Sequence, residues 1–198
     1  MNILVTGSNG QVGSEIREIS SNYSYNFFFT DRNNIDITCK DSIKDFCQAN
    51  NINVIVNCAA YTAVDKAETD IENADLGNRK AVKKLSIVSK DLDIKLIHIS
   101  TDYVFDGKNF KPYCEEFQTN PQGVYGKTKL DGENEMRDIN PKDSIIIRTS
   151  WVYSSFRNNF VKTMLRLGKE KESLGVIFDQ VGTPTYARDL AKAILDII

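Results

Sequence analysis

A tyrosine and a lysine four residues apart, with a threonine upstream, are the residues of this sequence best suited to acid–base chemistry. Tyr125 and Lys129 occupy positions i and i+4 of an expected helix, so their side chains share one face. A phenol with a pKa of about 10 is a poor acid–base catalyst at neutral pH, and a neighbouring ammonium group lowers that pKa. Thr101 ends an expected strand, where its hydroxyl can hold a carbonyl oxygen. The set predicts proton transfer to a substrate oxygen, although the Tyr–Lys spacing alone is equally compatible with a surface pair.

A glycine-rich turn near the amino terminus predicts a site for a dinucleotide. Gly7, Gly10 and Gly13 follow an apolar run and open a segment with helical spacing. Small residues let the backbone bend sharply and approach a pyrophosphate, and the first N–H groups of the helix attract the anion. Asp31 follows the second apolar run, where its carboxylate can accept hydrogen bonds from ribose hydroxyls. A tight strand-to-helix turn would explain the glycines alone, but the combination favours dinucleotide binding.

The residue after Asp31 bears on the choice of coenzyme. A carboxylate at position 31 favours NADH because it repels a 2′-phosphate, whereas the Arg32 guanidinium can hold one. We therefore expect the protein to accept both NADH and NADPH.

Short apolar runs alternate with longer amphipathic segments along most of the chain. The runs are rich in Ile, Val and Phe and cover residues 3–6, 26–30, 54–60, 96–100 and 145–149. Such runs are typical of parallel strands covered by helices on both faces. We therefore predict an α/β fold with a doubly wound parallel sheet, Rossmann-like and NAD(P)-binding, whose ligands lie at the carboxyl ends of the strands.

The pattern changes after Trp151. Helical spacing recurs at residues 160–167 and 190–195, and residues 176–178 resemble a short strand. The last helix reaches the end of the sequence without a glycine cap, so we expect a lobe that is cut short. The predicted division is a dinucleotide-binding domain at residues 1–150 and an incomplete, partial C-terminal substrate lobe at residues 151–198.

Composition narrows the classes of protein further. A chain of 198 residues can bury about 70% of its unfolded surface without disulfides. Its 25 Lys and Arg against 27 Asp and Glu leave a net charge of −2, which argues against nucleic-acid and anionic-membrane partners. The sequence has neither an apolar stretch of about 20 residues nor a signal-peptide pattern. Four cysteines without a CxxC pair and a single histidine predict no disulfide framework and no metal site, so we expect a cytoplasmic protein.

Several sequence blocks resemble those of a known family. They are GSNGQVG (7–13), VNCAAYTAVDKAE (56–68), STDYVFDG (100–107), YGKTKLDGE (125–133), RTSWVY (148–153), NNFVKTMLR (158–166) and DQVGTPT (179–185). Together they resemble the extended short-chain dehydrogenase/reductases and, more narrowly, the dTDP-4-dehydrorhamnose reductase family. The last five blocks are the most specific, because a dinucleotide fold does not itself require them.

The resemblance implies roles for individual residues. Tyr125 would donate the proton, Lys129 would tune it and hold the nicotinamide ribose, and Thr101 would bind the reacting oxygen. The expected coenzyme-binding residues are Gly7, Gly10, Gln11, Val12, Gly13, Asp31, Arg32, Asp36, Ile37, Ala60, Tyr61, Thr62, Asn78, Tyr125 and Lys129, with Asp36 and Ile37 in a short third strand. The expected substrate-binding residues are Thr101, Asp102 and Trp151.

The resemblance also implies an activity. NADH or NADPH would reduce the C4 ketone of dTDP-4-dehydro-L-rhamnose to dTDP-L-rhamnose, for cell-surface polysaccharide synthesis. It further implies a homodimer, in some members with Mg²⁺ at the subunit interface. Two alternatives stay open: another sugar-nucleotide reductase or epimerase of the same superfamily, and a non-catalytic NADP-binding regulatory subunit.

Three further positions are ambiguous from the sequence. His98 lies inside an apolar run and is expected to be a packed core residue. Glu68 is equally compatible with an ordinary solvated helix start and with a role at the site. Family members more often carry a polar residue at the position of Gly123, which makes the geometry at the start of the catalytic helix a point of difference.

Overall fold

A five-stranded parallel sheet forms the centre of the computed structural model, which describes residues 1–198. The strands are β1 (Asn2–Thr6), β2 (Asn26–Phe29), β3 (Val54–Asn57), β4 (Lys95–Thr101) and β5 (Ser144–Thr149). Their order is β2-β1-β3-β4-β5, and every neighbouring pair is parallel. The order reverses between β1 and β3, which is the point at which doubly wound sheets bind their ligands. The predicted fold class is confirmed.

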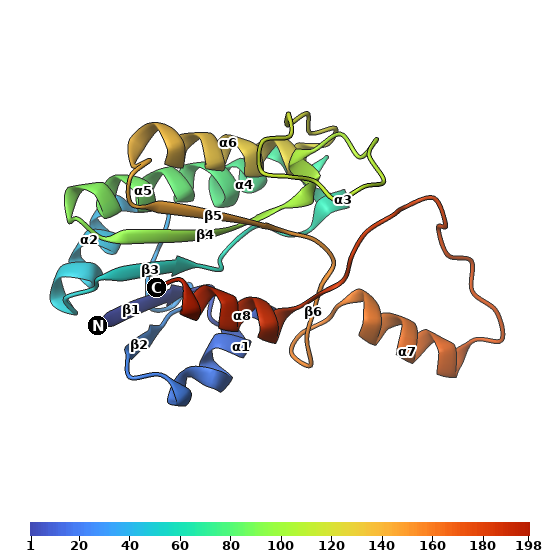
Figure 1. Cartoon of the computed structure of the whole chain (residues 1–198), viewed down its shortest axis with the longest axis horizontal. Helices are drawn as coiled ribbons and strands as arrows, with labels where there is room; N and C mark the ends of the chain where they lie inside the picture. Colours follow the sequence, from blue (N-terminus) through green and yellow to red (C-terminus); the bar gives the residue numbers. More distant parts are fainter.

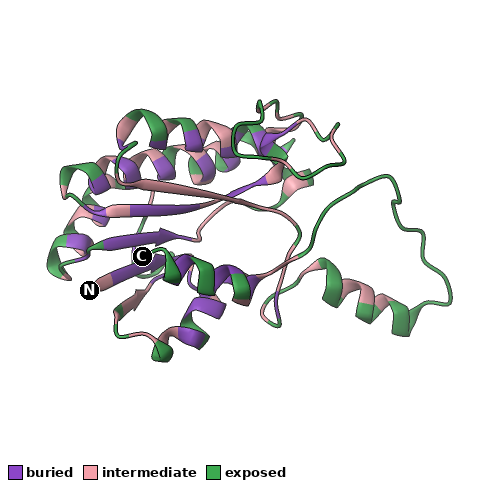
Figure 2. Cartoon of the chain, viewed as in Figure 1, coloured by how far each residue is buried: buried purple, intermediate pink, exposed green.

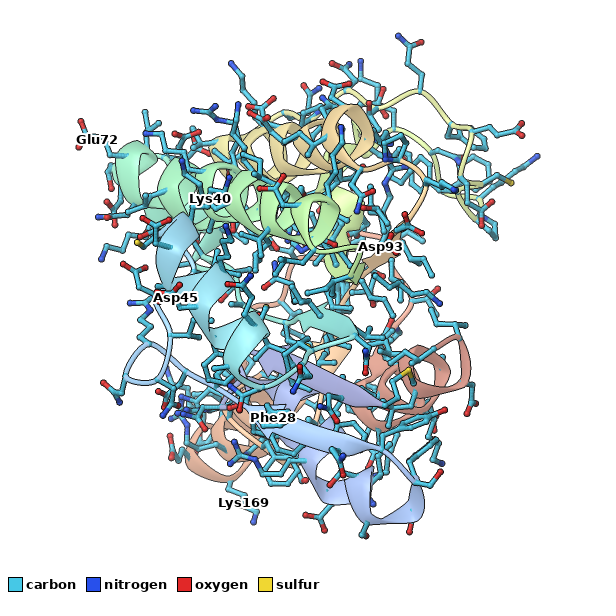
Figure 3. The ribbon with its side chains drawn as sticks, turned by 90° about the vertical axis from the view of Figure 1, so that its left-hand side faces the viewer. Phe28, Lys40, Asp45, Glu72, Asp93 and Lys169 are labelled. Atoms are coloured by element: carbon cyan, nitrogen blue, oxygen red, sulfur yellow. The ribbon has the colours of Figure 1, made fainter.

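Helices cover both faces of this sheet (Figure 1). The helices α1 (Gln11–Ile19) and α8 (Ala187–Asp196) lie on one face, and α2 (Lys40–Ala49), α5 (Ala81–Asp91) and α6 (Val124–Ile139) lie on the other. Successive strand residues point to opposite faces, so Ile3 and Val5 join one buried cluster while Leu4 joins the other. Lys40 at the start of α2, which is labelled in Figure 3, pairs with Asp91 of α5 at 2.8 Å. The continuous apolarity of the strands therefore reflects burial on both sides.

The last helix belongs to the layer that covers the sheet. Buried α8 residues, among them Leu190 and Ile194, share a cluster with β1 and α1. Arg188 of α8 donates to the buried carboxylate of Glu15 at 2.8 Å, and Ser154 donates to the same carboxylate at 2.6 Å. Part of the expected substrate lobe thus packs with the coenzyme domain, and the division at residue 150 stays a prediction.

The helix α7 (Phe160–Glu170) and the segment after it project from this body (Figures 1 and 2). The helix contains no buried residue, and residues 171–184 are all exposed. The short strands β6 (Val152–Tyr153) and β7 (Thr185–Tyr186) pair in parallel at its base. The strand expected at residues 176–178 is wrong, because no neighbouring strand pairs with that segment.

Short helical segments complete the structure. They are η1 (Ser20–Asn22), α3 (Val64–Ala67), α4 (Ile71–Asp75), the π-helical turn η2 (Leu76–Lys80) and η3 (Asp102–Val104). The third strand expected at Asp36 and Ile37 is also wrong. The Asp36 carboxylate accepts hydrogen bonds from the Thr38 N–H and hydroxyl at 2.8 and 2.7 Å, which bends this segment into a turn. None of the helices has the length and apolarity needed to cross a bilayer.

Candidate active site

The glycine turn connects β1 to α1 at the carboxyl end of the sheet. Gly7 has φ of 62°, and a Cβ there would lie 2.6 Å from the Ala59 nitrogen. A Cβ at Gly13 would lie 2.6 Å from the Ser8 Cα. Gly10 precedes Gln11 and provides no side-chain cap for α1, so the first N–H groups of this helix keep no side-chain acceptor. This open helix start fits the pyrophosphate of a dinucleotide, which would lie against Gln11, Val12 and Gly13.

Asp31 lies two residues beyond the end of β2 and is fixed by its neighbours. Its carboxylate accepts hydrogen bonds from the Asn9 amide at 2.7 Å and from the Asn33 N–H at 2.8 Å. The loop after β2 is thereby joined to the glycine turn. Arg32, the next residue in the chain, is exposed.

Asn78 connects the loop after β3 to α6. Its Oδ1 accepts from the Tyr61 N–H at 2.9 Å, and its Nδ2 donates to the Tyr61 carbonyl at 3.1 Å and to the Thr128 hydroxyl at 3.2 Å. The side chain is fully buried within the π-helical turn η2, an irregularity that is frequent at functional sites. Asn78 is therefore a support for the segment Ala60–Thr62, in which Tyr61 is half-buried and Thr62 exposed.

Thr101 and Tyr125 are brought together at the carboxyl end of β4. The Thr101 hydroxyl donates to Asp102 Oδ1 at 3.1 Å and accepts from the Tyr103 N–H at 3.2 Å. Burial raises the pKa of Tyr125 to about 12, and a hydrogen bond with Thr101 acts in the opposite direction. The Tyr103 ring packs edge-on against that of Tyr125, with centroids 5.5 Å apart. Tyr125 is therefore a protonated phenol at neutral pH, which suits a proton donor.

The expected lowering of the Tyr125 pKa by Lys129 is not found: burial raises this pKa, and the hydrogen bond with Thr101 is the influence that opposes burial. Lys129 itself is buried on the same helix, and its Nζ donates to the Ile99 carbonyl at 2.6 Å. Burial lowers the pKa of Lys129 to about 8, against the opposing influence of Glu133 and Cys58. The charge of Lys129 can therefore change at a pH well below that at which an ordinary lysine loses its proton.

Glu133 anchors α6 to the sheet. Its buried carboxylate accepts from Arg148 Nη2 at 2.6 Å, from Ser100 Oγ at 2.5 Å and from Arg137 at 2.8 Å. Burial raises the pKa of Glu133, but the hydrogen bonds from Arg148 and Ser100 outweigh it and the pKa is lowered. Sequence reasoning missed this residue, although its i+4 spacing from Lys129 places both on one face of α6.

A second carboxylate holds the start of the same helix. Glu68 Oε1 accepts from the Val124 N–H at 2.8 Å, where the helix end favours a negative charge. A Cβ at Gly123 would lie 2.9 Å from that oxygen. Gly123, where family members more often carry a polar residue, therefore leaves room for Glu68. No sequence pattern indicates the contact, because 56 residues separate its partners.

The residues expected on the substrate side lie in two places. Asp102 adjoins Thr101, and burial raises its pKa, with the Thr101 hydrogen bond opposing. Trp151 has φ of 47°, an uncommon conformation for a bulky residue, and its ring packs edge-on against Phe160 at 5.5 Å. A Cβ at Gly182 would lie 2.5 Å from the Trp151 Nε1, so this ring is packed against the segment 179–185. A substrate role for Trp151 stays a prediction.

The doubly wound sheet, the glycine turn and the Thr–Tyr–Lys set define a domain of the extended short-chain dehydrogenase/reductase class. Within that class, the chain belongs to the RmlD substrate binding domain family, whose family model matches residues 1–198. The resemblance inferred from the sequence blocks is confirmed.

Individual relatives agree with this assignment. A dTDP-4-dehydrorhamnose reductase of Aggregatibacter actinomycetemcomitans is 41% identical over 196 residues, covering 98% of this chain and 66% of the relative. The structure of a dTDP-4-dehydrorhamnose reductase from Clostridium acetobutylicum matches 100% of this chain and 70% of its own, with 44% identity and a TM-score of 0.95. One from Bacillus anthracis in complex with NADP matches 99% and 69%, with 37% identity and a TM-score of 0.95. The chain spans 66% of the length of the first curated relatives it matches.

Proposed function

We propose that this chain forms the coenzyme-binding and catalytic part of a dTDP-4-dehydrorhamnose reductase. The reaction would reduce the C4 ketone of dTDP-4-dehydro-L-rhamnose to dTDP-L-rhamnose, a precursor for cell-surface polysaccharide. The observation that carries the proposal is the hydrogen bond that joins Tyr125 to Thr101 at the carboxyl end of β4, with Lys129 buried one turn further along the same helix. The names of the relatives support the substrate.

In this proposal, the residues of the chain bind the coenzyme and donate a proton to the substrate. The start of α1 would hold the pyrophosphate, and Asp31 would accept from a ribose hydroxyl. NADH or NADPH, when bound, supplies the hydride. Tyr125, a neutral phenol, would protonate the oxygen that gains charge, while Thr101 holds that oxygen by a hydrogen bond. Lys129 lies one turn further along the helix and would bind the nicotinamide ribose.

The loop after β2 supports the use of both coenzymes. Asn9 and the Asn33 N–H already occupy part of the Asp31 carboxylate, which weakens its repulsion of a 2′-phosphate, and Arg32, the next residue, is exposed. The Bacillus anthracis relative was solved with NADP. We expect the Michaelis constants for NADH and NADPH to lie within about a hundredfold of each other, since one guanidinium–phosphate contact contributes only a few kcal/mol. A larger ratio would rule out dual use.

Assembly and location follow the family expectation. We propose a cytoplasmic homodimer in which Asp102 and Trp151 contact the dTDP-sugar. The chain gathers no group of three or more His, Cys, Asp or Glu side chains suited to a metal ion. Mg²⁺ at a subunit interface would therefore need ligands from both copies, and equilibrium dialysis of the dimer against Mg²⁺ tests this.

The decisive experiment measures coenzyme oxidation and sugar product together. We expect the chain to consume NADH or NADPH in proportion to dTDP-L-rhamnose formed. Tyr125→Phe is expected to lose most of kcat, about a hundredfold to ten-thousandfold, while coenzyme binding persists, because only the acid is removed. The matched control is Tyr113→Phe, which changes a phenol outside the site. Sugar interconversion without net oxidation would favour an epimerase, and coenzyme binding without reduction would favour a regulatory subunit.

A further inference from the structure

A chain of buried polar side chains crosses the sheet and ends at Lys129. Thr6 of β1 donates to Asn57 Oδ1 at 2.6 Å, and Asn57 Nδ2 lies 2.9 Å from His98 Nδ1 of β4. His98 Nε2 lies 3.1 Å from Lys129 Nζ. Each of the four residues exposes only 1% of its surface. Groups so deeply buried must satisfy their hydrogen bonds with one another, so the direction of each bond can be worked out.

The orientation of Asn57 follows from a backbone contact. The Ala59 N–H, which can only donate, lies 3.2 Å from Asn57 Oδ1. The amide oxygen of Asn57 must therefore face Ala59 and Thr6, and its NH₂ group must face His98. His98 Nδ1 consequently accepts a hydrogen bond and carries no proton.

The state of the histidine ring follows in turn. Burial lowers the pKa of His98 well below its usual range, with Lys129 acting in the same direction, so the ring is neutral. A neutral imidazole without a proton on Nδ1 carries it on Nε2. The Nε2–H group therefore points at Lys129 Nζ. A neutral amine can accept this hydrogen bond with its lone pair, whereas an ammonium group has only donors.

We propose that His98 is a positioning residue for the reaction: its Nε2–H favours the neutral amine of Lys129 and thereby sets the alkaline limit of activity. The inference rests on the proposed function, in which Lys129 binds the nicotinamide ribose of the coenzyme. His98 is thus more than the packed core residue expected from the sequence. Its effect reaches the site only through Lys129.

Other groups that face Lys129 act against His98. Glu133 on α6 and Cys58 after β3 both favour the charged form of Lys129. Arg148 holds two hydrogen bonds to Glu133 and so reduces its influence. Tyr125, one turn earlier on α6, is protonated at neutral pH and adds no charge. Among the groups that face Lys129, His98 is therefore the one whose hydrogen bond favours the neutral amine, and it does so without adding a charge.

The chain contains one histidine, so its imidazole nitrogens can be observed without ambiguity. In a proton–nitrogen correlation spectrum at alkaline pH, we expect a protonated Nε2 and a bare Nδ1. As the pH falls, both nitrogen shifts should change at the midpoint at which Lys129 gains its proton. That inflection should vanish in Lys129→Met and persist in Lys127→Met, a control at an exposed position of the same helix. A protonated Nδ1 at alkaline pH, or shifts that ignore Lys129, would overturn the inference.

The substitution Asn57→Asp reverses the direction of the hydrogen bonds that run from Asn57 through His98 to Lys129. It tests the inference even if Lys129→Met fails to fold. The new carboxylate still accepts from Thr6 and Ala59, and it also accepts from a protonated Nδ1 of His98. Nε2 then becomes an acceptor for the ammonium group of Lys129. We expect the alkaline limb of kcat/KM to move up by about one pH unit, a tenfold change in proton affinity.

A matched background separates this effect from the added charge. Asn57→Asp combined with His98→Leu carries the carboxylate without the ring, and we expect its limb to move less than half as far relative to His98→Leu alone. Equal shifts in both backgrounds would overturn the inference. The two proposals fail separately: an inactive chain whose imidazole shows the expected tautomer contradicts the function alone, and an active chain with a protonated Nδ1 contradicts only the role of His98.

Discussion

The α-helices α6 and α7 differ in burial: α6 packs against the sheet and its neighbouring helices, whereas α7 projects from the body of the protein. On α6, the polar side chains Lys129 and Glu133 are buried and hydrogen-bonded to partners on the sheet. On α7, no residue is buried, and the apolar side chains Phe160 and Leu165 are exposed. The contrast shows that the proposed catalytic groups are held by packing within the chain, whereas the region joined to Trp151 receives little support from its own contacts.

Breaking the charged anchor of α6 should have the largest effect on stability. Glu133→Gln leaves Arg148 without its carboxylate inside the protein, and we expect the free energy of unfolding to fall by about 3–5 kcal/mol. Glu170→Gln removes the partner of Arg166 in an exposed pair on α7 and should change it by less than about 0.5 kcal/mol. Urea unfolding of both variants provides the test, and equal losses would contradict the comparison.

Acid should act on the same anchor. The pKa of Glu133 is lowered in the folded chain, so its ion pair stabilises the fold fully above the unfolded value of about 4.3. That contribution is lost as the pH falls through the lower, folded pKa. We expect the stability difference between the parent chain and Glu133→Gln to shrink below about pH 4. Urea midpoints measured across this range test the sign, and a difference that grows in acid would refute it.

Two helical glycines, one in the packed helix α1 and one in the exposed helix α7, should change the free energy of unfolding in opposite directions when replaced by alanine. Gly13→Ala places a Cβ 2.6 Å from the Ser8 Cα at the start of α1, and such overpacking should cost about 1–3 kcal/mol. Gly168 lies within α7 with no atom within 4 Å of a Cβ, so Gly168→Ala should stabilise the chain by about 0.5–1 kcal/mol. Thermal unfolding of both variants checks this. A gain from Gly13→Ala would show that the turn has room to spare.

The sheet could be predicted from the sequence because helices cover both of its faces and each strand reads as an apolar run. The same reasoning failed at residues 176–178, where apolar residues have no strand to pair with, and at Asp36, whose side chain forms a turn. Whether these segments form strands depends on a side-chain hydrogen bond in one case and on a pairing partner elsewhere in the chain in the other. The apolar pattern of a short segment shows neither.

The proposed site divides in a similar way. Tyr125, Lys129 and the glycines could be found because their spacing along one helix or turn determines their geometry. The contact of Glu68 with Val124 and that of Asn57 with His98 join segments far apart in the chain, so no spacing indicates them. The pKa of Tyr125 could not be predicted either, because burial of the phenol depends on the packing of η3 against α6.

The smallest effect should come from the outward face of α7. Leu165 is 64% exposed, so Leu165→Gln removes little buried apolar surface and replaces one good helix former with another. We expect a change in the free energy of unfolding below about 0.5 kcal/mol, whereas Leu85→Ala in the buried cluster should cost about 2–5 kcal/mol. Urea unfolding at several protein concentrations gives both values. A loss of about 2 kcal/mol for Leu165→Gln that grows with concentration would mean that a second copy covers α7, since association stabilises a fold by mass action.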